Sequence, residues 1–191
     1  IELLHNYTLV HDDLPEMDND EERRGQPSVW KKYGHSTAVL VGDALQALAF
    51  QAAILSPVNQ VMITALLSIV AQGVVYGQVE DLRRAANLKV DLDFIYNHKT
   101  ADLFLAAAVM GGYAAEADEK ARESLMIYGC TLGLAFQYQD DLLDGDSPYD
   151  RKELRKRVRE MTRIAIGALK GLKGDTTFLK ELAKSLVNRK V

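Results

Sequence analysis

The chain has 191 residues, of which 48% are hydrophobic, and a formal net charge of −4 at pH 7. This composition predicts a folded domain with a sizeable core and excludes intrinsic disorder. The mild acidic charge argues against general binding to nucleic acid. The single cysteine, Cys130, excludes an intramolecular disulfide, as expected of a cytoplasmic protein.

Helical spacing runs along the whole chain. Four prolines separate the apolar segments, and no alternating strand pattern lies between them. Asp118 and Asp175 are expected to be N-caps. We therefore predict an all-α protein. Its expected helices lie near residues 1–13, 35–55, 58–86, 91–115, 118–144, 150–171 and 175–189.

The first predicted helix runs into an acidic segment. Residues 10–25 read VHDDLPEMDNDEERRG and hold seven carboxylates. Carboxylates this close repel one another, so a positive partner is expected. Because Pro15 disfavours a helical conformation at the residue before it, the helix should end near Asp13, and a loop should return Asp18 towards Asp12.

The next two predicted helices, 35–55 and 58–86, are apolar nearly all round. Such helices are expected to be buried on every side, in a core or an interface. The apolar run over residues 61–76 is shorter than the roughly twenty residues that a membrane span needs, so no span is predicted. The segment 150–171 is instead rich in charge and is expected to be a solvated surface helix.

A second acidic cluster ends the predicted helix 118–144, where residues 136–144 read FQYQDDLLD. Asp140 and Asp144 lie four residues apart and share a helix face, whereas Asp141 lies about 100° away. Two helices thus end their apolar runs on aspartates.

Carboxylate oxygens without histidine or cysteine suit Mg²⁺. A single acidic run is usually a solvated loop, and Glu21 and Glu22 are assigned to one. Two aspartate sets that face each other across a helical cavity could instead hold several Mg²⁺ ions around a diphosphate. The residues expected to complete the phosphate site are Arg23, Arg24, Lys99 and Thr100.

These motifs resemble the trans-isoprenyl diphosphate synthase, or polyprenyl synthetase, family, closest to its bacterial farnesyl diphosphate synthases. The matching stretches are HDDLPEMDNDEERRGQPSVWKKYG, AVLVGDALQALAF, HKTADLF and LAFQYQDDLLD. The resemblance implies a single domain over residues 1–191, built as an all-α bundle around a central cavity. It implies a Mg²⁺-dependent prenyltransferase that condenses dimethylallyl or geranyl diphosphate with isopentenyl diphosphate to give farnesyl diphosphate and pyrophosphate.

The resemblance also implies roles for individual residues. Asp12, Asp18 and Asp140 correspond to metal ligands, Asp144 ligates directly or through water, and up to three Mg²⁺ ions are expected with bound diphosphate. Together with Lys99, the first three form the implied catalytic set.

Substrate contacts follow from the same resemblance. Arg23, Lys99 and Thr100 correspond to contacts with the allylic diphosphate, and Arg24 to a contact with isopentenyl diphosphate. Gln137 lines the same pocket. A further family motif places Gln78 and Asp81 in support of the site.

Two features depart from the family pattern. The upstream helices that carry basic ligands for isopentenyl diphosphate, and the lysine-bearing loop after the second aspartate motif, are both missing from the printed chain. As printed, the chain is therefore expected to hold one diphosphate but to bind isopentenyl diphosphate poorly. The alternatives are a geranylgeranyl or longer-chain synthase, a class I terpene cyclase, and a non-catalytic prenyltransferase subunit.

Product length and assembly are also predicted. Thr8 and Tyr7 precede Asp12 by about one helical turn, with Tyr7 about 7.5 Å along the axis. They are expected to form the floor under the growing chain. In the family that the chain resembles, an aromatic residue there accompanies short products, so the resemblance favours a fifteen-carbon product. The helices 35–55 and 58–86 are predicted to form a two-fold homodimer interface, as in the family.

Overall fold

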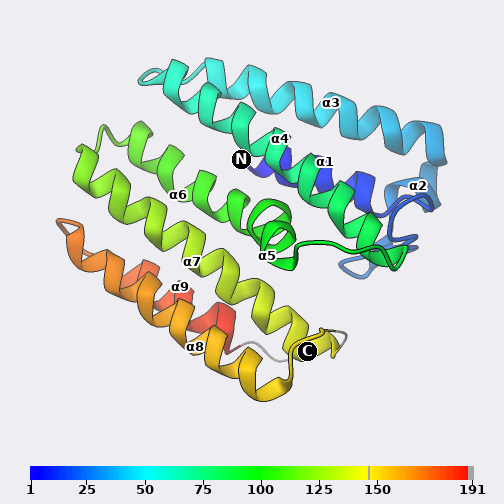
Figure 1. The fold of residues 1–191 in the computed structure, drawn as a ribbon. Helices are drawn as coiled ribbons and strands as arrows, with labels where there is room; N and C mark the ends of the chain where they lie inside the picture. The colour runs from blue at the N-terminus through cyan, green and yellow to red at the C-terminus, as the bar shows by residue number, and fades with distance from the viewer. Residues whose placement is uncertain (146, 189–191) are drawn as a thin grey trace. The chain divides into compact units, whose positions relative to one another are not determined.

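The computed structural model describes residues 1–145 and 147–188, and nearly all of its elements are helices (Figure 1). This confirms the predicted all-α class. The chain divides into two compact units, residues 1–68 and 69–191. The boundary lies inside the long helix α4 (Gln60–Ala85).

The first unit is built on the packing of α1 (Glu2–Asp12) against α3 (His35–Ile54). The ring of His11 lies where any side chain at Gly42 would have to be, and its Nε2 lies 3.0 Å from the carbonyl oxygen of Val39. Leu4 and Ala38 are completely buried between these helices' faces. Gly42 therefore lets α3 approach α1 closely.

The segment between α1 and α3 contains three short elements that the sequence did not predict. Strands β1 (Glu22–Arg23) and β2 (Gln26–Pro27) pair antiparallel, and α2 spans Val29–Tyr33. Arg24 and Gly25 connect the strands with φ angles of 55° and 75°. Both angles are positive, as a tight two-residue hairpin turn requires. This turn usually has the sequence Asn-Gly, and because Arg24 replaces the asparagine, the sequence did not indicate the hairpin.

In the second unit, the predicted helix 91–115 is three consecutive helical segments. They are α5 (Leu92–Ile95), the π-helix η1 (Tyr96–Ala101) and α6 (Asp102–Ala114). A π-helix has no propensity signature, so hydrophobic periodicity alone could not reveal it. The long helix α7 (Glu119–Asp144) packs against α6 and against α8 (Arg151–Ala168).

The charged helix α8 is not wholly solvated, contrary to the sequence expectation. Leu154, Val158 and Ala165 form a buried stripe on it. A short 3₁₀ turn, η2 (Leu169–Gly171), leads from α8 to α9 (Thr177–Val187), which packs on α7 and α8.

The two predicted N-caps have different outcomes. The carboxylate of Asp118 accepts a hydrogen bond from the Ala121 amide, which confirms this cap. Asp175 is displaced by one residue, because α9 begins at Thr177 and Thr176 occupies the cap position. The Asp175 carboxylate still accepts from the Thr177 amide at 2.8 Å, so it satisfies a donor of the first turn. Residue 189, the predicted helix end, lies outside the described residues.

For the single chain, the prediction that α3 and α4 are buried in a core is wrong, and their burial in an interface stays a prediction. Leu40 and Ile54 of α3 are 67% and 61% exposed, and Val61 and Ile69 of α4 are 73% and 68% exposed. Both helices are long and apolar enough to cross a membrane, a test that core helices of soluble proteins also pass. The absence of a membrane span therefore stays a prediction.

Candidate functional site

The first aspartate motif lies where α1 ends. The helix stops at Asp12, and the Asp18 amide donates to the Asp12 carbonyl at 2.9 Å. The Met17 amide donates to the Leu14 carbonyl at 2.9 Å, which closes the turn that contains Pro15. This confirms the predicted loop and brings the backbone of Asp18 back to that of Asp12.

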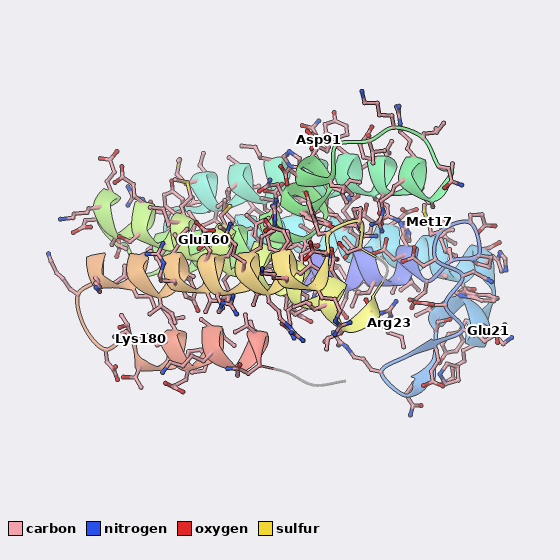
Figure 2. All side chains as sticks on the ribbon, turned by 60° about the horizontal axis from the view of Figure 1, so that its bottom comes forward. Met17, Glu21, Arg23, Asp91, Glu160 and Lys180 are labelled. Atoms are coloured by element: carbon pink, nitrogen blue, oxygen red, sulfur yellow. The ribbon has the colours of Figure 1, made fainter. Side chains whose placement is uncertain are left out.

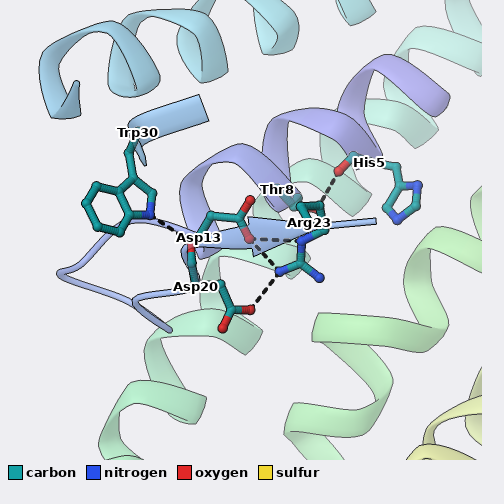
Figure 3. A network of polar contacts seen from close by, with 6 residues as sticks. All are labelled: His5, Thr8, Asp13, Asp20, Arg23 and Trp30. Carbon is teal, nitrogen blue, oxygen red and sulfur yellow. Dashed lines mark hydrogen bonds and ion pairs between the residues drawn. The ribbon is translucent and has the colours of Figure 1, made fainter. Parts of the chain in front are cut away.

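Asp13 is the buried member of this motif, with 3% of its surface exposed. The guanidinium of Arg23 donates to its carboxylate, through Nε at 2.9 Å and through a second nitrogen, and also to Asp20 at 3.0 Å (Figure 3). The hydrogen bond to Asp13 is the main cause that raises the pKa of Arg23. The indole of Trp30 donates to the Asp20 carbonyl at 2.8 Å, which holds the acidic loop in place.

Arg23 therefore compensates part of the acidic cluster, as an arginine directly after the acidic run was expected to do. Its partners, Asp13 and Asp20, come from the structure. The Arg23 side chain keeps 36% of its surface exposed, so it can also face an anion. Arg24, the other predicted phosphate contact, is exposed in the hairpin turn.

In the second unit, η1 packs against the face of α4 that carries Gly73, Gly77 and Asp81. We call this face the seat of η1. A side chain at Gly77 would lie 2.9 Å from the backbone of His98 and would overlap Lys99, and one at Gly73 would lie 2.5 Å from the Asp102 carboxylate. One turn further along α4, Asp81 accepts from Lys99 Nζ at 2.5 Å.

Gly77 and Asp81, four residues apart on α4, thus fix the backbone and the ammonium of Lys99, while Gly73 admits the Asp102 carboxylate. Arg84 also contacts the Asp81 carboxylate, at 3.0 Å. Within η1, His98 Nδ1 lies 2.7 Å from Asp102, and burial is the main cause that raises the pKa of Asp102. Gln78, the other residue implied to support the site, lies half-buried beside this seat on α4.

A chain of hydrogen bonds joins η1 to the second aspartate motif. The Thr100 hydroxyl donates to Gln137 at 2.6 Å, and the Gln137 amide donates to Asp141 at 3.1 Å. The Tyr96 hydroxyl donates to the other Asp141 oxygen at 2.5 Å. Tyr96 and Asp141 are 2% and 6% exposed, and burial raises the pKa of the Tyr96 hydroxyl.

The second motif therefore has one anchored aspartate and two that reach the surface. Asp141 is held inside the unit, whereas Asp140 is partly exposed and Asp144 is exposed. The sequence singled out Asp140 and Asp144 by their spacing but missed the anchor, Tyr96. A buried tyrosine near a Lys-Thr pair carries no local signal for this role.

Mg²⁺ fits the donors that the two motifs present. Among residues 1–145 and 147–188, no three acidic, histidine or cysteine side chains are gathered as a ready metal site. Mg²⁺ needs only one or two carboxylates, because water and substrate phosphates complete its shell. Carboxylates that are at least partly exposed lie at Asp12 and Asp18 in the first unit and at Asp140 and Asp144 in the second. Their role as ligands stays a prediction.

The two residues predicted to limit chain length lie on α1. The ring of Tyr7 is half-buried and meets the ring of His11 edge-on at 5.0 Å. Burial is the main cause that raises the pKa of Tyr7, followed by the charges of Asp12 and Asp43. Thr8 is 8% exposed, and its hydroxyl donates to the His5 carbonyl of its own helix at 2.8 Å.

The chain was compared with known proteins. Residues 1–181 match the polyprenyl synthetase family. A farnesyl diphosphate synthase of Micrococcus luteus is 37% identical over 158 residues, which cover 78% of this chain and 54% of the relative. A short chain isoprenyl diphosphate synthase of Methanocaldococcus jannaschii is 40% identical over 200 residues, which cover 100% of this chain and 60% of the relative. The chain thus spans little more than half the length of these two curated relatives.

A solved structure gives the same picture. The apo crystal structure of an FPP/GFPP synthase from Zymomonas mobilis superposes with a TM-score of 0.88 at 32% identity, covering 96% of this chain and 72% of that chain. This likeness confirms the predicted fold class.

Proposed function

The chain belongs to the polyprenyl synthetase family, and on that basis we propose that it acts as a Mg²⁺-dependent prenyltransferase. It condenses dimethylallyl or geranyl diphosphate with isopentenyl diphosphate and releases pyrophosphate. The proposed product is farnesyl diphosphate, with geranylgeranyl or a longer prenyl diphosphate as the alternative.

One observation supports this proposal most strongly, namely that both aspartate motifs have the same internal design. In the first, Asp13 is buried against Arg23, and in the second, Asp141 is buried against Tyr96. In each motif the preceding aspartate, Asp12 or Asp140, is left partly exposed at the end of an apolar helix. Anchoring one carboxylate orients the backbone of its neighbour, which suits ligands that must meet a metal and a diphosphate.

The proposed roles follow from the donors. Asp12, Asp18, Asp140 and Asp144 would hold Mg²⁺, which when bound neutralises charge on the diphosphate leaving group. Lys99 and Thr100 would contact the allylic diphosphate. The ammonium of Lys99 is held by Asp81, so it is oriented before substrate arrives. The guanidinium of Arg23 would donate to the same diphosphate, and that of Arg24 to isopentenyl diphosphate.

We also propose that the apolar surface of the first unit is a two-fold homodimer interface rather than a lipid contact. Its exposed apolar side chains include Leu40, Leu48 and Ile54 of α3 and Val61 and Met62 of α4. Covering such side chains removes apolar area from water, which favours association. We further propose that the protein acts in the cytoplasm.

The function is tested by incubating the purified full-length protein with Mg²⁺, isopentenyl diphosphate and either allylic diphosphate, and then identifying products by mass. A linear fifteen-carbon diphosphate is expected, and a twenty-carbon one would support the alternative. A cyclic hydrocarbon would indicate a terpene cyclase. No product with either substrate, from protein that is folded by circular dichroism, would favour a non-catalytic subunit and contradict the proposal.

A further inference from the structure

The surface of α8 carries a ladder of positive charge that the proposed reaction does not use. The ladder consists of four arginines at intervals of four residues, namely Arg151, Arg155, Arg159 and Arg163. Like charges at this spacing destabilise a helix. The nearby carboxylate of Glu153 does not pair with the ladder, because it accepts a hydrogen bond from Nε of Arg157, another arginine of α8, at 2.9 Å. Within the described ranges, no ion pair joins an acidic side chain to the ladder. Glu160 lies on the same helix (Figure 2).

Three of these arginines line a cavity of about 500 Å³ where α8 meets α7 and α9. The same cavity is lined by apolar side chains from all three helices, namely Leu142, Ile166 and Val187. Its volume falls within the range of small-molecule sites. A concave site with cations along one side and aliphatic groups on the other suits an amphiphilic anion.

The cavity lies on the far side of α7 from the second aspartate motif. Leu142 is two residues from both Asp140 and Asp144, which places it about 200° around the helix from each. A ligand in the cavity would therefore not compete with those two carboxylates for the same helix face.

We propose that this cavity binds an organic diphosphate that carries a short apolar chain, without a metal ion. Successive arginines of the ladder are about 6 Å apart along the axis, so neighbouring guanidiniums can each grip one phosphate group with paired hydrogen bonds. The chain then covers Leu142, Ile166 and Val187. The ligand supplies the negative charge that the ladder lacks. The site is a partly open concavity between three helices, into which a soluble ligand can insert its chain.

Ligand binding to the cavity can be measured separately from turnover. Binding of geranyl diphosphate is measured by calorimetry in EDTA, where the metal-dependent reaction cannot proceed. The variant carries R155Q, R159Q and R163Q. Loss of these charge-assisted bonds should weaken binding by at least about tenfold. Unchanged affinity in the variant would overturn the proposal.

A matched control removes the same charge elsewhere. The variant with K152Q, K156Q and K170Q alters three exposed lysines that do not line the cavity, and it should bind like the wild type. Equal weakening in this control would show a general charge effect and overturn the site. If the triple arginine variant fails to fold, the single variant R159Q replaces it. Its affinity for geranyl diphosphate should fall several-fold, and unchanged affinity would overturn the proposal.

Three probes identify the ligand class. Inorganic diphosphate and geraniol should each bind more weakly than geranyl diphosphate, because each lacks one half of the ligand. Inorganic diphosphate that binds as tightly as geranyl diphosphate would overturn the apolar half of the site. Binding to phosphatidylglycerol vesicles in preference to geranyl diphosphate would assign the ladder to a membrane instead. Turnover with Mg²⁺ should be the same in the triple arginine variant and the wild type.

Discussion

At the scale of single residues, each motif has one buried, hydrogen-bonded aspartate and one more exposed aspartate that is proposed to bind metal. Asp13 and Asp141 are buried and hydrogen-bonded, so their loss should affect folding. Asp12 and Asp140 are partly exposed among neighbouring carboxylates, so their loss should affect turnover. Substitutions within each motif can therefore tell the two roles apart.

The first prediction concerns the proposed metal ligands. Asp12→Ala or Asp140→Ala should each lower kcat by about 10²–10³, because charge on the leaving pyrophosphate is then poorly neutralised. The Tm of the metal-free protein should stay equal or rise, since a repelling carboxylate has been removed. Steady-state kinetics at saturating Mg²⁺ and calorimetry check both effects. Near-wild-type turnover in either variant would refute the site assignment.

The second prediction concerns the anchor of the second motif. Tyr96→Phe removes the hydroxyl that donates to Asp141 and leaves a buried carboxylate oxygen without that bond. We expect the free energy of unfolding to fall by about 1–3 kcal/mol. Denaturant unfolding measures the loss. Tyr33→Phe, at a tyrosine that is 59% exposed, serves as the control and should change stability little.

The third prediction concerns product length. Tyr7→Ala should remove the ring that is proposed to close the floor under the growing chain, so longer prenyl diphosphates are expected while the allylic substrate is still consumed. Tyr7→Phe keeps the ring and should give the wild-type product. Chromatography of the dephosphorylated products distinguishes the lengths. The same distribution in wild type and Tyr7→Ala would show that another residue sets the length.

At the scale of elements, the π-helix η1 depends on the glycines of α4. Gly73 and Gly77 admit the backbone and side chains of η1, and Asp81 on the same face holds Lys99. Four-residue glycine spacing in the sequence indicates close helix packing, but it does not show what packs there. The structure assigns the space to the segment that carries Lys99 and Thr100.

The fourth prediction tests this seat. Gly77→Ala places a methyl group against the backbone of His98 and Lys99, which must shift. We expect a loss of about 1–3 kcal/mol in unfolding free energy and a higher KM for the allylic diphosphate. Gly111→Ala in α6 meets nothing within 4 Å and should be neutral or stabilising by about 0.5–1 kcal/mol. Similar effects of both variants would show that the seat has no special role.

At the scale of the whole molecule, each unit has its own packing. The first unit is centred on α1 and α3, and the second on α7 with its neighbours α6 and α8. The apolar side chains that α3 leaves exposed are the main surface feature that the single chain does not explain.

The fifth prediction concerns assembly. Light scattering at micromolar concentration should give the mass of a dimer, and Leu40→Arg together with Leu48→Arg should shift it to a monomer, because buried charges oppose association. The control Lys152→Gln on α8 should remain dimeric. A monomeric wild type at that concentration would contradict the proposed interface.

Much of the fold was predictable from the sequence because its signals are local. Helical periodicity located α1, α3, α4 and α7 to within a turn, and Pro15 located the end of α1. The hairpin at Arg24 and Gly25 and the π-helix η1 were missed. Their backbone conformations depend on contacts rather than on residue preference.

The sequence by itself determined an all-α protein in which two apolar helices end on aspartates, since periodicity and carboxylate spacing are properties of neighbouring residues. Only the tertiary structure decided which aspartate in each motif is buried. Arg23 reaches Asp13 from ten residues away, and Tyr96 reaches Asp141 from forty-five residues away. Burial and hydrogen bonding of a carboxylate depend on which distant segments the fold brings to it, and local patterns carry no record of them.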